Sequence, residues 1–202
     1  RQRGRSRSQT QPFQNVPGTR NALRIWGNAL WFNALWFAAV IGSTHGLLWP
    51  ALVCMAGLLA WTVLCGGDWR ADCRMGVAGV LVALTVEPVW INAGALTYPD
   101  VGALGLPPTW IVVLWAGFAV SFNHCLAWLR GRLLLAAVLG SAGSLSSISA
   151  GLSLEAVVMP EGWLQAALFY APVWAFLTPA LAWLSERFAP GTAACVSPPS
   201  SE

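Results

Sequence analysis

The sequence contains no lysine, and only 9% of its 202 residues are charged. A soluble domain carries about a quarter charged residues, because its surface must be wetted by water. The scarcity of charge therefore excludes an ordinary soluble domain. It also excludes a nucleic-acid partner, since that function needs a basic face on a folded soluble surface.

Paired cysteines and clustered histidines are also missing. The five cysteines have no CxxC or paired spacing, so no disulfide framework is predicted. The only histidines, His45 and His124, are far apart in the sequence, so we predict no metal site and no haem. The Gly-x-Ser-x-Gly frame of a serine nucleophile is absent as well, and we predict no catalytic residue from motifs.

Apolar residues are abundant instead: they make up 56% of the chain and form six long stretches. Each stretch is close to the ~20 residues that cross a ~30 Å hydrocarbon core as a helix. Spans must be helical, because lipid offers backbone groups no hydrogen-bond partner. We predict spans at residues 22–43, 47–66, 75–94, 109–129, 133–154 and 162–184.

All eleven basic residues are arginines, and they lie at or beyond the ends of these stretches. They occur only before or in the first turn of the first span, in the second and fourth loops, and after the sixth span. Arginine near a span resists translocation, so this side is predicted to be cytoplasmic. We therefore predict an all-α, polytopic bundle of six transmembrane helices with both termini in the cytoplasm. The membrane unit is residues 22–187, between a disordered arginine-rich leader (1–21) and a flexible tail (188–202).

Tryptophan is frequent, with 13 copies. Rings near the ends of the spans are predicted to anchor the membrane interfaces, where an amphipathic ring is stable. Rings inside the spans have two interpretations: bulky packing against lipid or helices, or contact with a flat ring such as a pigment or quinone. The predicted interface anchors are Trp26, Trp49, Trp69, Trp110, Trp128, Trp163 and Trp183.

Glu87 is the only acidic residue well inside a predicted span. A charge at the bilayer centre costs at least ~2.5–3.5 kcal/mol, so Glu87 should face the bundle and be neutral or paired. At ~1.5 Å per residue, Asn92 and Tyr170 lie at a similar depth and are its predicted partners. The alternatives are a structural hydrogen bond, a proton-carrying carboxyl group, and a contact with a lipid headgroup.

A second group of polar residues is predicted in the cytoplasmic half of the membrane. Asn123 and His124 lie in the fourth predicted span, and Asn28 and Asn33 on the first span reach comparable depths. The two asparagines of the first span are about 140° apart around a helix, so they cannot face the same partner. One should point into the bundle and the other toward another helix or the interface. These asparagines also make a retained signal-anchor a better interpretation of the first span than a cleaved signal peptide.

The fifth predicted span is rich in glycine and serine. Gly140 with Ser144, Gly143 with Ser147, and Ser147 with Gly151 form small-x-x-x-small pairs, which let helix axes approach closely. This pattern predicts a central, tightly packed helix.

Four stretches resemble a known family of bacterial inner-membrane proteins, domain-of-unknown-function family 2878. They are LWFAAVIG (35–42), GALTYP (94–99), PTWIVVLW (108–115) and FNHCLAWL (122–129), and the resemblance covers about residues 28–184. It implies that Asn123, His124 and the aromatic residue Trp128 form a recurring motif, and that an acidic residue, often aspartate, occurs at the position of Glu87. It also implies the inner (cytoplasmic) membrane as the location, but no reaction.

Three functions remain open. The first is a non-enzymatic helical subunit or scaffold that binds membrane lipids or other membrane-protein subunits, with no dedicated cofactor but with a bound lipid or pigment as an option. The second is a proton-coupled carrier that uses Glu87, lined by Asn92 and Tyr170. The third is an intramembrane lipid-modifying enzyme that uses Asn123 and His124 near the cytoplasmic headgroups.

Overall fold

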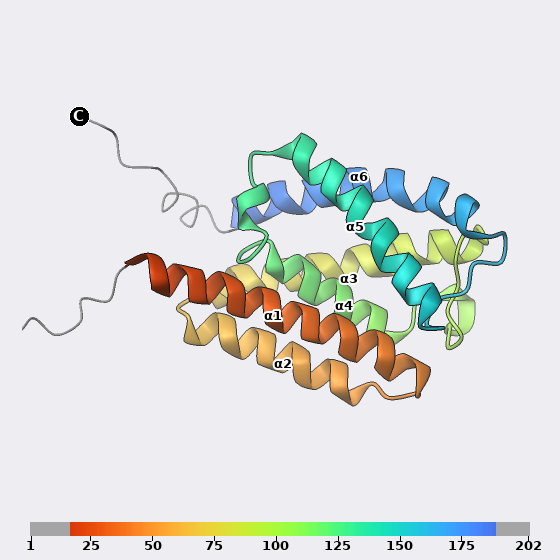
Figure 1. Ribbon diagram of the computed structural model, residues 1–202, viewed down its shortest axis with the longest axis horizontal. Helices are drawn as coiled ribbons and strands as arrows, with labels where there is room; N and C mark the ends of the chain where they lie inside the picture. Colours follow the sequence, from red (N-terminus) through yellow and green to blue (C-terminus); the bar gives the residue numbers. More distant parts are fainter. Residues whose placement is uncertain (1–16, 189–202) are drawn as a thin grey trace, which may run out of the picture.

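The computed structural model describes residues 17–188, and this part of the chain forms six α-helices and two short 3₁₀ helices (Figure 1). The predicted all-α class is confirmed. The elements are α1 (Pro17–Thr44), α2 (Trp49–Leu64), α3 (Trp69–Asn92), η1 (Ala103–Gly105), α4 (Thr109–Ser121), η2 (Ala127–Leu129), α5 (Leu133–Ser153) and α6 (Trp163–Phe188). Residues 17–21 already belong to α1 rather than to the predicted leader. The rest of the leader and the predicted tail beyond residue 188 lie outside the described residues.

The start of α3 differs from the predicted span, which begins at residue 75. The Asp68 carboxylate accepts hydrogen bonds from the backbone N–H groups of Arg70 (2.9 Å) and Ala71 (3.4 Å). This is an N-cap, which stabilises the first helical turn by satisfying its free donors. The helix therefore begins at Trp69, and Asp72 is drawn into its first turn.

Residues 65–68 form a tight connection between α2 and α3. Gly66 has a φ of +75°, a conformation that costs glycine little. The turn lets the Gly67 N–H donate to the Thr62 carbonyl at 2.8 Å, which satisfies a free acceptor at the end of α2. The chain can thus reverse within four residues and place α3 beside the other helices.

Consecutive helices pack as hairpins: α1 with α2, α3 with α4, and α5 with α6 (Figure 1). Further contacts of α4 with α1 and α2, and of α6 with α3, join the three hairpins into one bundle. The described carboxyl end of α6 thus lies at the same end of the bundle as the start of α1.

The central helix is α4, and not the helix of the fifth predicted span. It has only 13 residues, and eight of them are buried. A helix that is apolar all round is a helix surrounded by protein, and α4 contacts α1, α2 and α3. The prediction of a central fifth span was therefore wrong: α5 packs closely on α6 but exposes most of its other faces.

Four helices of the described part, α1, α3, α5 and α6, are long and apolar enough to cross a membrane. The other two are apolar but shorter, with 16 residues in α2 and 13 in α4. The bundle presents many large apolar side chains outward, such as Leu30, Leu134 and Phe176. Such a continuous apolar exterior is typical of a protein surrounded by lipid.

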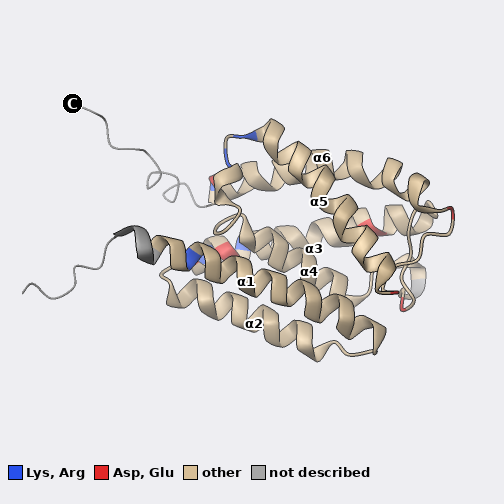
Figure 2. Ribbon diagram, viewed as in Figure 1, with Lys and Arg blue, Asp and Glu red and all other residues tan. Residues whose placement is uncertain are grey.

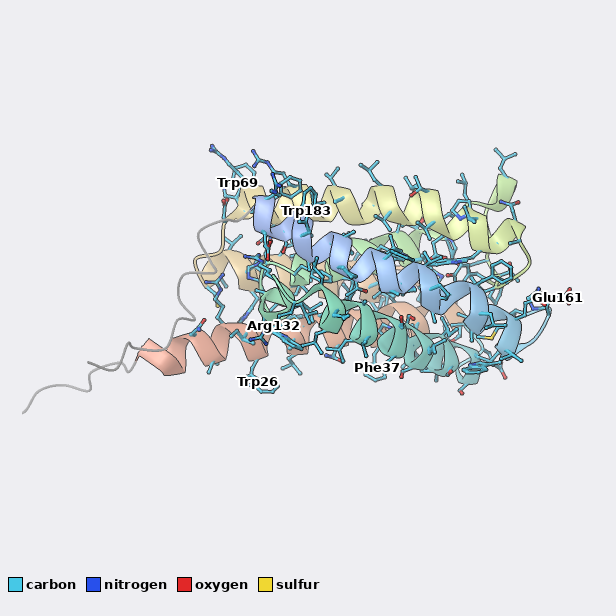
Figure 3. The ribbon with its side chains drawn as sticks, turned by 90° about the horizontal axis from the view of Figure 1, so that it is seen from above. Trp26, Phe37, Trp69, Arg132, Glu161 and Trp183 are labelled. Carbon is cyan, nitrogen blue, oxygen red and sulfur yellow. The ribbon has the colours of Figure 1, made fainter. Side chains whose placement is uncertain are left out.

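Charged residues gather at the two ends of the bundle (Figure 2). The arginines of residues 17–188 lie only at the end that holds the start of α1, the turns at 65–68 and 122–132, and the end of α6; we name this the arginine end. Opposite it are the turns at 45–48, 93–108 and 154–162, which contain no arginine; the last two of these turns contain acidic residues. Figure 3 shows Arg132 and Glu161 at these two opposite ends.

Six of the seven tryptophans predicted as interface anchors are exposed near the ends of the bundle, including Trp26, Trp69 and Trp183 in Figure 3. Trp110 is the exception, because it is only 4% exposed. Its ring packs edge-on against Tyr98, with 5.4 Å between the ring centroids, and its indole N–H donates to Asp100 at 3.4 Å. The prediction that Trp110 is an interface anchor was wrong, because the 93–108 segment covers it.

Candidate functional site: an aromatic pocket and two buried acidic residues

Helices α1, α4, α5 and α6 surround a pocket of about 500 Å³. Its wall includes Gly143 on α5, and no atom of another helix lies within 4 Å of the position that a Cβ would take there. The pocket therefore has open space beside α5. Its aromatic wall is formed by Phe32, Trp36, Trp110, Trp115, Phe118, Tyr170 and Trp174.

A single hydrogen bond connects α1 with α5 beside this pocket. The Trp36 indole N–H donates to the Ser147 hydroxyl at 3.0 Å. The extensive contacts of α1 are with α2 and α4, whereas those of α5 are with α6. Between α1 and α5, the pocket is thus closed by side chains rather than by closely packed helices.

Glu87 on α3 forms part of the pocket wall and is only 1% exposed. The Tyr98 hydroxyl donates to its Oε2 at 2.7 Å, and the Trp115 indole N–H donates to its Oε1 at 2.7 Å. We name these three residues the Glu87 cluster. The prediction that Glu87 faces the bundle interior is thus confirmed. Its predicted partners were wrong, because both donors come from segments that follow α3 in the chain.

The two predicted partners of Glu87 have other contacts. Asn92 is exposed near the end of α3, and its amide donates to the Pro88 carbonyl at 2.7 Å. Tyr170 is buried, and its ring packs against Trp90 with 4.3 Å between the centroids. The predicted depth of a residue in the membrane did not identify the hydrogen-bond partner of Glu87, because the 93–108 segment folds back and brings Tyr98 to Glu87.

Backbone pairing holds Tyr98 in place. The preceding residue, Thr97, exchanges two hydrogen bonds of 2.8 Å with Val158 in the turn between α5 and α6. Burial, and next the neighbouring Glu87 carboxyl group, raise the pKa of the Tyr98 hydroxyl well above its ordinary value. Tyr98 therefore stays protonated and is a permanent donor at this end of the pocket.

Two polar atoms in the pocket wall make no hydrogen bond of good geometry with the described residues, although the Tyr170 hydroxyl lies near one of them, the Trp174 indole N–H. They are the indole N–H of Trp174 and the hydroxyl of Thr178, which lie one turn apart on α6. The Trp174 ring stacks on Trp115, with 4.7 Å between centroids and 17° between planes. A buried donor without an acceptor is costly, which makes these atoms candidates for ligand contacts.

A second buried group, which we name the Asp72 cluster, lies at the arginine end. His124 Nε2 lies 2.9 and 3.0 Å from the two carboxylate oxygens of Asp72, and the Asn123 amide donates to Asp72 Oδ1 at 2.9 Å. Asp72 is 3% exposed. His124 Nδ1 is buried and has no partner in the described part of the chain. The Gly67 backbone covers the ring, since a Cβ at Gly67 would lie 3.0 Å from His124 Cε1.

Arg130 connects the Asp72 cluster to α6. Its guanidinium donates to the Phe122 carbonyl (3.1 Å), to Asn123 Oδ1 (3.0 Å) and to the Ser185 hydroxyl (2.9 Å). These bonds replace helical ones, so α4 ends at Ser121. Asn123 and His124 therefore lie in a turn, and the prediction that helix continues to residue 129 was wrong.

The two asparagines of α1 face different directions, as predicted. Asn28 is fully buried, and its Oδ1 accepts a hydrogen bond from the Cys125 backbone N–H at 3.3 Å. Asn33 is exposed at the edge of the pocket and donates to the Ala29 carbonyl at 2.8 Å. Asn28 thus helps to hold the turn after α4, whereas Asn33 makes no hydrogen bond to another helix.

The small residues of α5 have separate roles. Gly140 lets α5 approach α6, because a Cβ there would collide with Thr178 and with the Trp174 carbonyl. Gly151 lies against Val157, and Ser144 donates to its own helix. All of these residues line the pocket, as do Gly143 and Ser147, so the repeated spacing serves both packing and pocket volume.

Sequence reasoning missed Asp72 as a buried residue, because it was placed in the loop before the third span. An N-cap at Asp68 was the available signal. It also missed Tyr98 and Trp115 as partners of Glu87, although both lie in the stretches 94–99 and 108–115 that carry the family resemblance.

Residues 17–188 contain no group of three or more His, Cys, Asp or Glu side chains arranged to hold a metal ion.

A family model described as "Protein of unknown function (DUF2878)" matches residues 25–180. Because this match covers most of the chain, the protein belongs to that family. No curated protein and no solved structure matches the chain.

Proposed function

We propose that this member of the DUF2878 family is a multi-pass protein of the bacterial inner membrane that binds a lipid-like molecule in the pocket between α1, α4, α5 and α6. All six helices cross the bilayer in this proposal, and both termini are cytoplasmic. The membrane unit is residues 22–187.

The arginine end supports this orientation. Positively charged residues next to spans are retained in the cytoplasm, and every described arginine lies at that end. At 1.5 Å per residue, α2 is about 24 Å long and α4 about 20 Å long. Non-helical backbone next to α4 completes the crossing, and it is tolerated at membrane depth because it is buried in protein.

The aromatic pocket is the observation that carries the proposal of lipid binding. Its volume of about 500 Å³ falls within the range of small-molecule sites, and its wall is apolar with a few placed polar groups. The separation between α1 and α5 offers a lateral route for a molecule that is dissolved in the bilayer. A bundle with these features suits a binding subunit or scaffold, alone or within a larger membrane complex.

Filling the pocket tests the proposal. Gly143→Phe should place a ring in the open space beside α5, whereas Ala142→Phe adds the same ring on an exposed position outside the pocket. The amount of lipid that copurifies in mild detergent, measured by native mass spectrometry, should fall about tenfold for Gly143→Phe, which corresponds to about 1.4 kcal/mol of lost binding. It should stay unchanged for Ala142→Phe. Equal lipid content in the two variants, or a wild-type protein free of lipid, would contradict the proposal.

A proton-coupled carrier is a second candidate, since the pocket reaches the carboxyl group of Glu87. A carrier must expose this carboxyl group to water during its cycle. Carbodiimide should then label Glu87 in native membranes, and Glu87→Gln should abolish the labelling. Absence of labelling across the pH range would eliminate the carrier.

A lipid-modifying enzyme is a third candidate, favoured by the paired Asp72 and His124 side chains with a free imidazole nitrogen. An oriented imidazole of this kind is a common general base. If the protein is such an enzyme, a His124→Ala strain should have a changed membrane lipid profile. An unchanged profile would remove this candidate.

A further inference from the structure

The charges of the pocket wall restrict the ligand. Glu87 is the only acidic residue in the wall, and no arginine or histidine of the described part lines it. No described arginine or histidine forms an ion pair with Glu87 either. An ionised carboxylate would thus have no compensating charge in an apolar site, so the neutral acid is favoured.

A neutral Glu87 gives the Glu87 cluster one more O–H donor than the hydrogen bond to Tyr98 uses. A neutral Glu87 and Tyr98 together carry two O–H groups, but a single hydrogen bond joins them. Because Tyr98 donates in that bond, the O–H of a neutral Glu87 needs an acceptor of its own. One O–H is therefore available at the pocket wall.

Two more donors, both on α6, lie in the same wall. The Trp174 indole N–H can only donate, and the neighbouring Tyr170 hydroxyl does not accept from it with good hydrogen-bond geometry. The Thr178 hydroxyl has no partner among the described residues and lies one turn further along α6. Trp115 contacts both the Glu87 cluster and Trp174, because its indole N–H donates to Glu87 while its ring stacks on Trp174. The free donors therefore border one continuous space.

We infer that the ligand is an uncharged lipid that carries a carbonyl oxygen within its apolar body, and that Trp174 N–H donates a hydrogen bond to this oxygen. This inference rests on the proposed lipid-binding function and names the chemical class of the ligand. An ammonium group does not fit beside Trp174, since it carries donors only and cannot accept the indole hydrogen bond. A carboxylate lipid does not fit either, because the wall supplies no cation and already contains Glu87.

Matched amphiphiles test the inference on the full-length protein in detergent. The probes are methyl undecyl ketone, tridecane, tridecylamine and tridecanoate, which share chain length and differ in the polar group. The wild-type protein should bind the ketone about tenfold more tightly than tridecane, as expected for one good hydrogen bond in a buried site. The amine and the carboxylate should bind more weakly than the ketone.

Trp174→Phe keeps an aromatic ring but removes the N–H, so the affinity for the ketone should fall about five- to tenfold while the affinity for tridecane stays unchanged. Trp183→Phe is the matched control on the same helix, since Trp183 is 49% exposed and lies outside the pocket wall. In isotope-edited infrared spectra, the carbonyl stretch of the carbon-13-labelled ketone should lie at lower frequency in the wild type than in Trp174→Phe.

The outcomes separate the two proposals. A wild type that binds none of the probes would overturn the proposed lipid-binding function. Equal affinity for ketone and tridecane, or tighter binding of the amine or carboxylate, would overturn the inference and leave lipid binding intact. If Trp174→Phe fails to fold, the affinity of Thr178→Val for the ketone and the carbonyl stretching frequency of the ketone bound to the wild type test the inference instead. A wild-type frequency equal to that of a ketone without a hydrogen bond would overturn the inference.

Discussion

Buried polar residues at the arginine end connect segments that are distant in the chain. Asp72 lies in the first turn of α3, yet its hydrogen-bond partners, Asn123 and His124, follow α4. Arg130 extends the same network to Ser185 on α6. Burial makes these bonds important to the fold, because removing one member leaves the others without partners and without water.

We expect Asp72→Ala to lower the free energy of unfolding by about 3 kcal/mol, because it leaves buried partners unpaired. Asp68→Asn should change it by less than about 0.5 kcal/mol, since asparagine is an equally good N-cap. Denaturation of the purified protein in detergent measures both. A loss below about 1 kcal/mol for Asp72→Ala would argue against a structural role for this network and would favour the enzyme hypothesis.

The sequence alone predicted that some of the polar residues are buried, but it did not predict their hydrogen-bond partners. Glu87 was recognisable because an acidic residue in an apolar run must face protein, and helical geometry separated Asn28 from Asn33. Asp72 was not recognisable, because a carboxylate beside arginines at the end of a span usually remains solvated. Only the fold-back of the turn after α4 brings His124 to it.

At the scale of the helix, α5 shows how small residues can perform two functions. Gly140 faces α6, where a side chain would collide with Thr178, whereas Gly143 faces the open pocket three residues later. The small-x-x-x-small spacing predicted close packing correctly on one face of the helix. It did not predict that α5 is peripheral, because the same residue types also line a pocket.

The two glycines give a direct comparison. Gly140→Ala should lower the free energy of unfolding by about 1–3 kcal/mol, because the added methyl group overpacks the α5–α6 contact. Gly143→Ala should leave stability unchanged or raise it by up to about 1 kcal/mol, since alanine favours helix and the space is open. Thermal unfolding in detergent measures both changes. Similar effects at the two positions would contradict the assigned packing of α5 on α6.

At the scale of the whole molecule, the helices alternate in direction, and the described arginines lie at one end only. The exterior between the ends is apolar, with large side chains facing outward. This combination is the physical basis for our proposal that the arginine end is cytoplasmic and that the turns at 45–48, 93–108 and 154–162 lie on the other side of the membrane.

Cysteine accessibility tests this arrangement. In a cysteine-free background, Glu161→Cys and Arg132→Cys place single thiols on exposed turns at opposite ends of the bundle (Figure 3). A membrane-impermeant maleimide should label Glu161→Cys in intact cells stripped of their outer barrier. It should label Arg132→Cys only after the membrane is permeabilised. Labelling of both thiols from the same side would refute the six-span topology.

The sequence by itself determined the helical class, the approximate positions of the helices, the grouping of the described arginines at one end of the bundle and the burial of Glu87. These properties follow from local composition and from the cost of placing charge or free backbone groups in lipid. Tertiary structure alone decided which helix is central, which donors reach Glu87 and where the pocket lies. These depend on how the turns at 93–108 and 122–132 fold back, and such contacts between distant segments leave no periodic pattern in the chain.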